Sequence, residues 1–292
     1  MRIVALDIGG TSIKSGIWDG ENTSELKEWD TNAKLGGKLL VENVVKILKT
    51  YSGFEAIGIS TAGQVDVTDG SICYANENIP GYTGMKVREI LETEFQVPVF
   101  VDNDVNAAAY GELYYGAGKD IDDFLMLTYG TGVGGAIVID KKVYYGSTYA
   151  GGSFGGIVVH PEDIDGSANL AGCYEKYAST TALVAMAKEV DQNLDNGRKI
   201  FEAMDRPEVR KVVDKWIDEI VYGLVTLIHI FNPTDIILGG GVFAQSYVIN
   251  RLKMRVLKYV YPQAKNVRLH QAKLGNSAGL IGAAVKAGEL IE

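Results

Sequence analysis

Two glycine turns that carry threonine are the residues with the clearest chemistry in this chain. One is in ALDIGGTSIKSG (residues 5–16) and the other in LTYGTGVGGAIV (residues 127–138). In each, an apolar strand leads into the turn and a second apolar strand follows it. Glycine lets the backbone come close to a ligand, so that successive N–H groups can point at an anion. Two such turns across a cleft could hold a polyphosphate, which indicates a nucleotide and a reaction at its terminal phosphate.

The first turn offers the groups that a phosphate and its metal ion need. Asp7 could help to place a hydrated Mg²⁺, and Lys14 could approach phosphate oxygens as a point charge. Gly9, Gly10 and Thr11 offer backbone amides and a hydroxyl. A plain hairpin would explain one turn of this kind, but the presence of a second turn favours phosphate binding.

The second turn and a third glycine cluster complete the predicted nucleotide site. Neither phosphate turn is a Walker A loop or a dinucleotide fingerprint, because both turns lead into strands. The third cluster, at residues 239–242, follows a strand, and its flat backbone could pack against adenine; tight packing of strand on helix is the alternative. The ATP-binding candidates in these two segments are Gly130, Thr131, Gly132, Gly239, Gly240, Gly241 and Val242.

Asp104 is the candidate catalytic base. It lies where a predicted strand gives way to a helix, immediately after Asn103. A carboxylate there can orient an acceptor hydroxyl and take its proton, and phosphoryl transfer otherwise needs mainly alignment and charge stabilisation. Capping the helix is the alternative role of this aspartate. Its occurrence together with two phosphate turns favours the catalytic role.

Strands that alternate with helices must position these residues. Apolar periodicity predicts helices over residues 37–51, 85–95, 105–115 and 208–231, and a final small-residue helix over 276–287. This alternation predicts an α/β fold with mainly internal sheets. The second half begins in the same way as the first, which predicts two related lobes with a cleft between them.

Composition limits the partners and the compartment. The chain has 292 residues, 47% of them hydrophobic, and a net charge of −9, which argues against nucleic acid and membrane surfaces as partners. Cys73 and Cys173 form no disulfide framework, no secretory leader precedes the first strand, and no apolar stretch could span a bilayer. We therefore predict a cytoplasmic protein.

The three histidines share no metal-ligand spacing, and His229, in LVTLIHIF, is predicted to be a core residue.

Taken in order, these motifs resemble those of the ROK family (repressors, open reading frames and sugar kinases). The matching segments are DIGGTSIK, TAGQVD, VDNDVNAAAYGE, LTYGTGVGGAI, FNPTDIILGGGV and GNSAGLIGA, which cover nearly the whole chain. The resemblance implies the actin-like ATPase (ribonuclease H-like) fold and the phosphorylation of a sugar hydroxyl, usually that on C6, with ATP and Mg²⁺. It also implies a homodimer. We expect a small N-terminal lobe of residues 1–111 plus 277–292 and a large C-terminal lobe of residues 112–276.

The resemblance also implies a set of sugar-binding residues. Asp104 corresponds to the family's catalytic base, Asn103 to a sugar ligand, and Gly63 lies in the loop that lines the sugar site. Asn78 is a further substrate-binding candidate. Glu175 is the acid of a Gly-Cys-x-Glu segment and could accept hydrogen bonds from a sugar. The alternative for Glu175 is an acid favoured by the dipole in the first turn of a helix.

Two departures from the family pattern concern the sugar and a zinc ion. Many relatives carry Glu-x-Gly-His, whose Glu holds sugar hydroxyls and whose His contacts sugar or binds zinc; here Ser153 and Gly156 stand at these positions. The cysteine cluster that completes a structural zinc site corresponds to residues 166–173, where Cys173 alone remains. One thiolate cannot hold a four-coordinate zinc ion. We therefore predict no zinc site.

The same departures bear on the substrate. A hydrogen bond to a carboxylate is worth about 1.5–3 kcal/mol, so the change to Ser153 and Gly156 weakens the grip on a single hexose and frees volume. A second sugar ring could fill that volume, which favours a β-glucoside or cellobiose-like substrate. Glucokinase, N-acetylmannosamine kinase and a sugar-binding protein of weak activity remain as alternatives. A ROK repressor would need a DNA-binding module before the first strand, which begins at Arg2.

Overall fold

The computed structural model describes residues 1–164, 166 and 170–292, and it divides the chain into two compact units. Residues 112–120, residues 143–151 and Asn276, which our lobe prediction placed in the C-terminal lobe, group with the first unit; the lobe bounds themselves stay a prediction. Within the described part of the chain, no helix combines the length and the apolar character needed to cross a membrane. Unit 1 comprises Met1–Asp120, Val143–Gly151 and Asn276–Glu292, and unit 2 comprises Ile121–Lys142 and Gly152–Gly275.

Unit 1 is built on a five-stranded sheet in the order β3-β2-β1-β4-β7. Strand β1 is antiparallel to β2 and parallel to β4, which in turn is parallel to β7. Nearly every side chain of β1 and β4 is buried, as expected for central strands that are covered on both faces. The strands are β1 (Ile3–Ile8), β2 (Ser12–Trp18), β3 (Thr23–Asp30), β4 (Ala56–Thr61) and β7 (Val99–Asn103).

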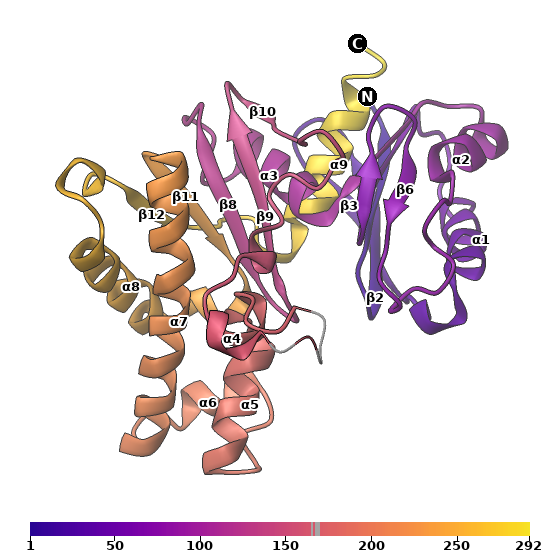
Figure 1. The fold of residues 1–292 in the computed structure, drawn as a ribbon. Coiled ribbons are helices and arrows are strands. Elements are labelled where there is room, and N and C mark those ends of the chain that lie inside the picture. Colours follow the sequence, from indigo (N-terminus) through magenta and orange to yellow (C-terminus); the bar gives the residue numbers. More distant parts are fainter. Residues whose placement is uncertain (165, 167–169) are drawn as a thin grey trace. The chain divides into compact units, whose positions relative to one another are not determined.

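Helices cover both faces of this sheet (Figure 1). On one face, the apolar sides of α1 (Gly37–Leu48) and α2 (Val87–Phe95) join the sheet in a core cluster, next to the small hairpin of β5 (Gln64–Asp66) and β6 (Ser71–Tyr74). On the other face, α3 (Asp104–Tyr115) packs on α9 (Ala278–Gly288).

Glycines bring the backbones of α3 and α9 together. A Cβ atom built on Gly282 of α9 would lie 1.7 Å from the carbonyl oxygen of Ala107 and 2.6 Å from the nitrogen of Gly111. A Cβ on Gly111 of α3 would lie 2.3 Å from the carbonyl oxygen of Ala278. Only glycine fits at these two positions. The close contact fixes α3, whose first residue is Asp104.

Unit 2 repeats the plan of unit 1. Its five-stranded sheet has the order β10-β9-β8-β11-β12, in which β8 is antiparallel to β9 and parallel to β11, and β11 is parallel to β12. An outer hairpin is therefore followed by parallel strands in both units. The strands are β8 (Phe124–Tyr129), β9 (Val133–Ile139), β10 (Lys142–Val143), β11 (Asp235–Gly239) and β12 (Arg268–Gln271). Val143, the second residue of β10, is grouped with unit 1.

The long helix α7 (Pro207–Phe231) anchors the core of unit 2. It begins with a proline, which suits the first turn of a helix, and it ends at Asn232, whose φ of 46° is left-handed. The buried indole of Trp216 donates to the carbonyl oxygens of Ala178 and Ser179 at 3.0 and 3.1 Å. The other helices are α4 (Glu175–Ala178), α5 (Thr180–Val190), α6 (Gly197–Glu202) and α8 (Ser246–Tyr259).

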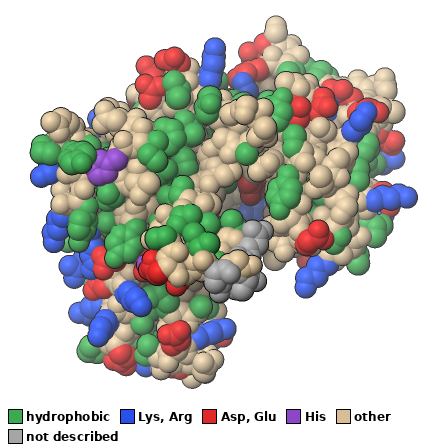
Figure 2. Space-filling view, in the orientation of Figure 1, with side chains coloured by type: hydrophobic (Ala, Val, Ile, Leu, Met, Phe, Trp, Pro, Cys, Tyr) green, Lys and Arg blue, Asp and Glu red, His purple; other side chains and the backbone are tan. Residues whose placement is uncertain are grey.

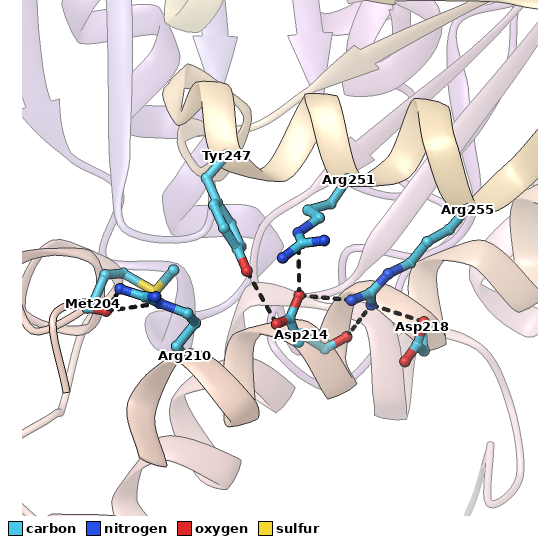
Figure 3. Close-up of polar contacts among 7 residues, drawn as sticks. All are labelled: Met204, Arg210, Asp214, Asp218, Tyr247, Arg251 and Arg255. Atoms are coloured by element: carbon cyan, nitrogen blue, oxygen red, sulfur yellow. Dashed lines mark hydrogen bonds and ion pairs between the residues drawn. The ribbon is translucent and has the colours of Figure 1, made fainter. Parts of the chain in front are cut away.

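A polar cluster joins α8 to α7 (Figure 3). The Arg255 guanidinium lies 2.6 Å from an Asp214 carboxylate oxygen and 2.8 Å from Asp218. The Tyr247 hydroxyl donates to the second Asp214 oxygen at 3.0 Å, and Arg251 lies 3.7 Å from the first. These contacts hold α8 against α7.

His229 does not lie in the core, so that prediction was wrong. It lies on the outward side of α7 together with Ile230, which is 65% exposed. Its Nε2 accepts a hydrogen bond from the backbone N–H of Tyr261 at 3.2 Å, and the two rings are in edge contact. The buried apolar stripe of this part of α7 is formed by Leu224, Leu227 and Ile228, and the helical period places His229 outside it.

Candidate active site

The first glycine turn projects from the end of β1. The register of β1 with β2 puts Asp7 directly opposite Lys14, and the Ser60 hydroxyl of β4 donates to Asp7 Oδ1 at 2.6 Å. Burial raises the pKa of Asp7, against the opposing effects of the Ser60 hydrogen bond and the Lys14 charge. Lys14 Nζ lies 3.4 Å from the carbonyl oxygen of Asn276. An acid and a base therefore lie side by side at the start of the turn.

Backbone contacts hold the turn and leave its tip open. The Gly9 N–H donates to the Ser12 carbonyl at 3.0 Å, and the Thr31 hydroxyl donates to the Gly9 carbonyl at 2.7 Å. Gly10 and Thr11 are exposed at the tip, and a Cβ on Gly10 would meet no described atom within 4 Å. This arrangement suits a turn that presents amides and a hydroxyl to a ligand.

Asp104 is the first residue of α3, and Asn103 rather than Asp104 caps that helix. The Asn103 Oδ1 accepts from the N–H groups of Val105 and Asn106 at 2.9 and 3.3 Å. Its Nδ2 donates to the Gly63 carbonyl oxygen at 2.9 Å. The Gly63 position, at φ 100°, is restricted to glycine because a Cβ would lie 2.8 Å from the Tyr74 carbonyl oxygen.

The electrostatics of Asp104 suit a base. Burial, followed by the nearby charge of Asp7, raises the pKa of Asp104 to about 6. The carboxylate is thus ionised at neutral pH and basic enough to take a proton. Unit 1 brings Asp7, Asn103, Asp104 and Gly63 together. Asn78 is exposed in the loop after β6, and no hydrogen bond among the described residues joins it to Asn103, Asp104 or Gly63.

In unit 2, the second glycine turn is tied to the start of α5. The Gly130 N–H donates to the Gly132 carbonyl at 3.0 Å, and the Gly130 carbonyl accepts from the Thr180 N–H at 2.9 Å. The Thr180 hydroxyl donates to the Tyr129 carbonyl at 3.2 Å. Since Ser179 caps α5, the positive end of that helix lies at the turn. The chemistry is that of an anion site.

The third glycine cluster lies against the same turn. Gly240 has φ 118°, and a Cβ there would lie 2.3 Å from the Tyr129 carbonyl oxygen, so only glycine fits. The turn and the cluster border a cavity of about 960 Å³. It brings together four of the predicted ATP residues, Gly130, Thr131, Gly241 and Val242.

Several residues of this cavity were not predicted from the sequence. They come from the last residue of β8, from α5, from α6 and the two residues before it, and from Gln245, which precedes α8. The Ser-Thr-Thr run at residues 179–181 was the one available signal, since such runs favour helix starts. The additional lining residues are Tyr129, Thr180, Thr181, Val184, Asp195, Asn196, Gly197, Arg198, Phe201, Glu202 and Gln245.

The Glu175 carboxylate, a sugar candidate, lies against the second turn. A Cβ on Gly132 would be 2.6 Å from Glu175 Oε2, and one on Gly155 would be 3.2 Å from the same atom. Ser153 and Gly156 are exposed at the two ends of a short 3-10 turn, and a Cβ on Gly156 would meet no described atom within 4 Å. The space beside Gly156 is therefore open.

The segment that corresponds to the zinc-binding cysteines lies partly outside the described residues, because residues 167–169 are not described. Cys173 is buried, and its backbone forms an isolated antiparallel β-bridge with that of Val158. In the rest of the chain that the structure describes, no three His, Cys, Asp or Glu side chains group as metal ligands. The absence of zinc stays a prediction.

His160 connects the segment after Gly156 to α7. His160 Nε2 lies 2.7 Å from Glu219 Oε2 of α7, and Nδ1 lies 3.0 Å from Glu162 Oε1. The ring also packs on Tyr177 of α4, with centroids 4.1 Å apart. Partial burial lowers the pKa of His160, but the two carboxylates outweigh it and raise that pKa above its usual value.

Two sheets of one strand order, each with a glycine turn after its first strand, define the actin-like ATPase fold, as solved structures of similar chains confirm. The ROK family model matches residues 3–289, and the chain belongs to the ROK family.

The relatives that the chain resembles are full-length matches. A glucokinase of Halalkalibacterium halodurans is 32% identical over 308 residues, which cover 96% of this chain and 92% of the relative. A beta-glucoside kinase of Listeria monocytogenes is 31% identical over 291 residues, which cover 97% and 96%. The structure of a ROK family glucokinase from Streptomyces griseus, solved with glucose and AMPPNP, is similar with a TM-score of 0.85 at 29% identity. The match covers 99% of this chain and 100% of that one.

Proposed function

We propose that this protein is an ATP-dependent sugar kinase that transfers the γ-phosphate of ATP to a sugar hydroxyl, that on C6. The observation that carries the proposal is Asp104, a carboxylate with a raised pKa, held beside Asn103 and the Gly63 loop. The 960 Å³ cavity of unit 2, with its glycine turn and the start of α5, supports ATP as the phosphoryl donor. Similarity to a glucokinase and a beta-glucoside kinase supports a sugar as the acceptor.

In this reaction the sugar oxygen attacks the γ-phosphorus, the bond from that phosphorus to the β–γ bridging oxygen breaks, and ADP leaves. Asp104 orients the hydroxyl and accepts its proton as the new bond forms. Asn103 and the loop of Gly63 hold the sugar. The amides of residues 9–11 and 130–132, together with Lys14, stabilise the charge on the phosphates.

Mg²⁺ fits the residues around Asp7. The carboxylate of Asp7 and the hydroxyl of Ser60 are oxygen donors, which this ion prefers, and one carboxylate with retained waters is its usual protein environment. Asp7 would hold the ion through water. When bound with ATP, the ion supplies neutralisation of the phosphate charge.

The substrate that we propose is a β-glucoside or cellobiose-like sugar. The space beside Gly156 supports it, because a second ring could occupy volume that a larger side chain would fill. Ser153, Gly156, Glu175 and Asn78 stay our proposed sugar-binding residues in addition to Asn103 and Gly63. Glucokinase and N-acetylmannosamine kinase activities are the alternatives, and a sugar-binding protein of weak activity is a further one.

Release of ADP over a panel of glucose, N-acetylmannosamine, fructose, cellobiose and gentiobiose tests the proposal, with Asp104→Asn as the matched variant. We expect the variant to retain ATP binding and to lose about 10²-fold or more in turnover. Turnover on the disaccharides supports the β-glucoside assignment, and turnover on one monosaccharide alone would replace it. Near-normal turnover of Asp104→Asn would refute the base. Trace turnover on every sugar, with sugar binding retained, would favour the binding protein.

We also propose a cytoplasmic homodimer without zinc that binds neither nucleic acid nor membrane. Apolar side chains on the surface of unit 2 support a partner subunit: Tyr222 and Ile230 of α7 are 47% and 65% exposed, and Tyr259 and Tyr261 are 62% and 73% exposed. Figure 2 shows hydrophobic groups on the surface of the molecule. Light scattering tests the dimer. Stoichiometric zinc after dialysis against a chelator would contradict the zinc prediction.

A further inference from the structure

Asp102 is a wholly buried carboxylate two residues before the proposed base. Three donors surround it in unit 1. Its Oδ1 accepts from the backbone N–H of Asn103 at 2.7 Å and from Asn106 Nδ2 at 3.2 Å. Its Oδ2 accepts from the hydroxyl of Tyr145 at 2.7 Å. A buried carboxylate that is held at both oxygens has one available position.

Hydrogen bonds connect Asp102 to the proposed sugar-binding residues. Asp102 Oδ1 holds the Asn103 peptide and, through Asn106, the first turn of α3. Asn103 in turn caps α3 with its Oδ1 and holds the Gly63 carbonyl with its Nδ2. A shift of the Asp102 carboxylate would therefore displace Asn103, the start of the helix at Asp104, and the Gly63 loop together.

Tyr145 comes from a segment, residues 143–151, that is anchored in unit 1 at more than one point. The segment closes on itself where the Gly151 N–H donates to the Tyr145 carbonyl at 2.8 Å. The Tyr145 hydroxyl is also 3.3 Å from that of Tyr110 on α3. The side chain of Tyr149, at φ 59°, lies near that of Asp66, the last residue of β5, and its ring is in edge contact with that of Tyr145.

Tyr145 and Tyr149 thus each lie against an aspartate that is close in sequence to a predicted sugar-binding residue. Asp102 precedes Asn103, and Asp66 closes the strand that follows Gly63. An aromatic residue in the left-handed region is rare and persists only where its surroundings hold it. The anchors are consistent with a segment that holds the sugar-binding elements of unit 1 in register.

We propose that Tyr145 is a positioning residue of the phosphoryl transfer: its hydrogen bond to Asp102 fixes Asn103 and Asp104 relative to the sugar. This inference rests on the proposed function. It predicts that loss of the Tyr145 hydroxyl lowers kcat/KM for the sugar and leaves KM for ATP unchanged.

Tyr145→Phe tests the inference, because it removes one oxygen and keeps the ring. The matched control is Tyr115→Phe, at the opposite end of α3, whose hydroxyl donates to the Gly20 carbonyl at 2.8 Å. We expect Tyr145→Phe to lower kcat/KM for the sugar about 10-fold, on the scale of a slightly misplaced reacting group, with KM for ATP unchanged. We expect Tyr115→Phe to match the wild type in both constants. A lower melting temperature of Tyr145→Phe with an unchanged kcat/KM for the sugar would overturn the inference, and so would an equal rise in KM for ATP.

A double-mutant cycle with Asp102→Asn separates a shared action from two independent ones. If Tyr145 acts through Asp102, the double variant will be no slower than the slower single variant. Effects that multiply would overturn the inference. Turnover of the sugar panel by the wild type tests the proposed function without any variant. Failure of the proposed function can therefore be told apart from failure of the inference about Tyr145. Should the wild type turn over no sugar, calorimetric binding of cellobiose and glucose to the wild type and to Tyr145→Phe gives the same comparison.

Discussion

Replacement of Gly282 by alanine should destabilise unit 1, although alanine is the better helix former. The added Cβ would lie 1.7 Å from the Ala107 carbonyl oxygen and 2.6 Å from the Gly111 nitrogen. Both neighbours are backbone atoms of α3, which cannot turn away as a side chain can. The two helices must therefore separate.

The expected magnitude follows from two opposing terms. Overpacking of a tight contact costs about 1–3 kcal/mol, and a collision with backbone places Gly282→Ala at the upper end of that range. Alanine returns about 1 kcal/mol of helix propensity. The free energy of unfolding should fall by about 2 kcal/mol, which corresponds to a loss of about 4–8 °C in melting temperature for a chain of this size.

Gly288→Ala, at the end of the same helix, is the matched control. Its Cβ would meet the flexible Met1 side chain at 3.3 Å, so we expect a change within about 0.5 kcal/mol. Calorimetric melting and the fluorescence of Trp18 and Trp29, both in unit 1, measure the effect. If Gly282→Ala melts at or above the wild-type temperature, or shifts by the same amount as Gly288→Ala, then backbone contact does not hold α3 and α9 together.

Three further predictions concern pH and the nucleotide. Asp104 must be ionised to act as a base, and its pKa is raised to about 6; turnover should therefore be about 10-fold lower at pH 5 than at pH 7, and a flat pH–rate profile would exclude it as the base. The folded-state pKa of His160 is raised, so its contribution to stability is full below its unfolded pKa of about 6.5 and is lost as pH rises through the folded value; in urea titrations His160→Gln should lose more stability at pH 6 than at pH 9, and an equal loss would show that Glu219 does not bind the charged form. Gly240→Ala, whose Cβ would meet the Tyr129 carbonyl at 2.3 Å, should raise KM for ATP at least as much as it affects the sugar, and a selective effect on the sugar would contradict the adenine assignment.

Much of the fold could be predicted because its signals are local. The apolar strands on each side of the glycine turns and the apolar stripe of α7 have clear periods, and the structure has the strands and the helix within a few residues of the expected bounds. Strand β3 was not predicted, since its side chains are mostly exposed and carry no alternating pattern. Helix α6 was not predicted because its six residues are too few to show a helical period. His229 was misplaced because an apolar neighbourhood in sequence was taken for burial.

The candidate site could be predicted where glycines and acids mark it, and not where α5 and α6 line the cavity. Gly240 was singled out as part of a run of three glycines and Gly63 through the resemblance to the ROK motifs, and in the structure a Cβ at either position would collide with backbone. Arg198 and Phe201 of α6 line the same cavity as the second glycine turn, and no short sequence motif indicates this. The sequence also allowed Asp104 to be the helix cap; in the structure Asn103 takes that role. The bond between Tyr145 and Asp102 spans 43 positions and has no local signal.

The shared strand order of the two sheets has a consequence for the history of the chain. One row of paired residues crosses each sheet beside its glycine turn: Lys14, Asp7, Ser60 and Asp102 in unit 1, and Gly134, Thr128 and Gly239 in unit 2. The first row is charged or polar throughout, whereas the second has almost no side chain. The chain thus has the form of a duplicated segment whose two copies now differ at equivalent positions, with polar and charged side chains in one and almost none in the other.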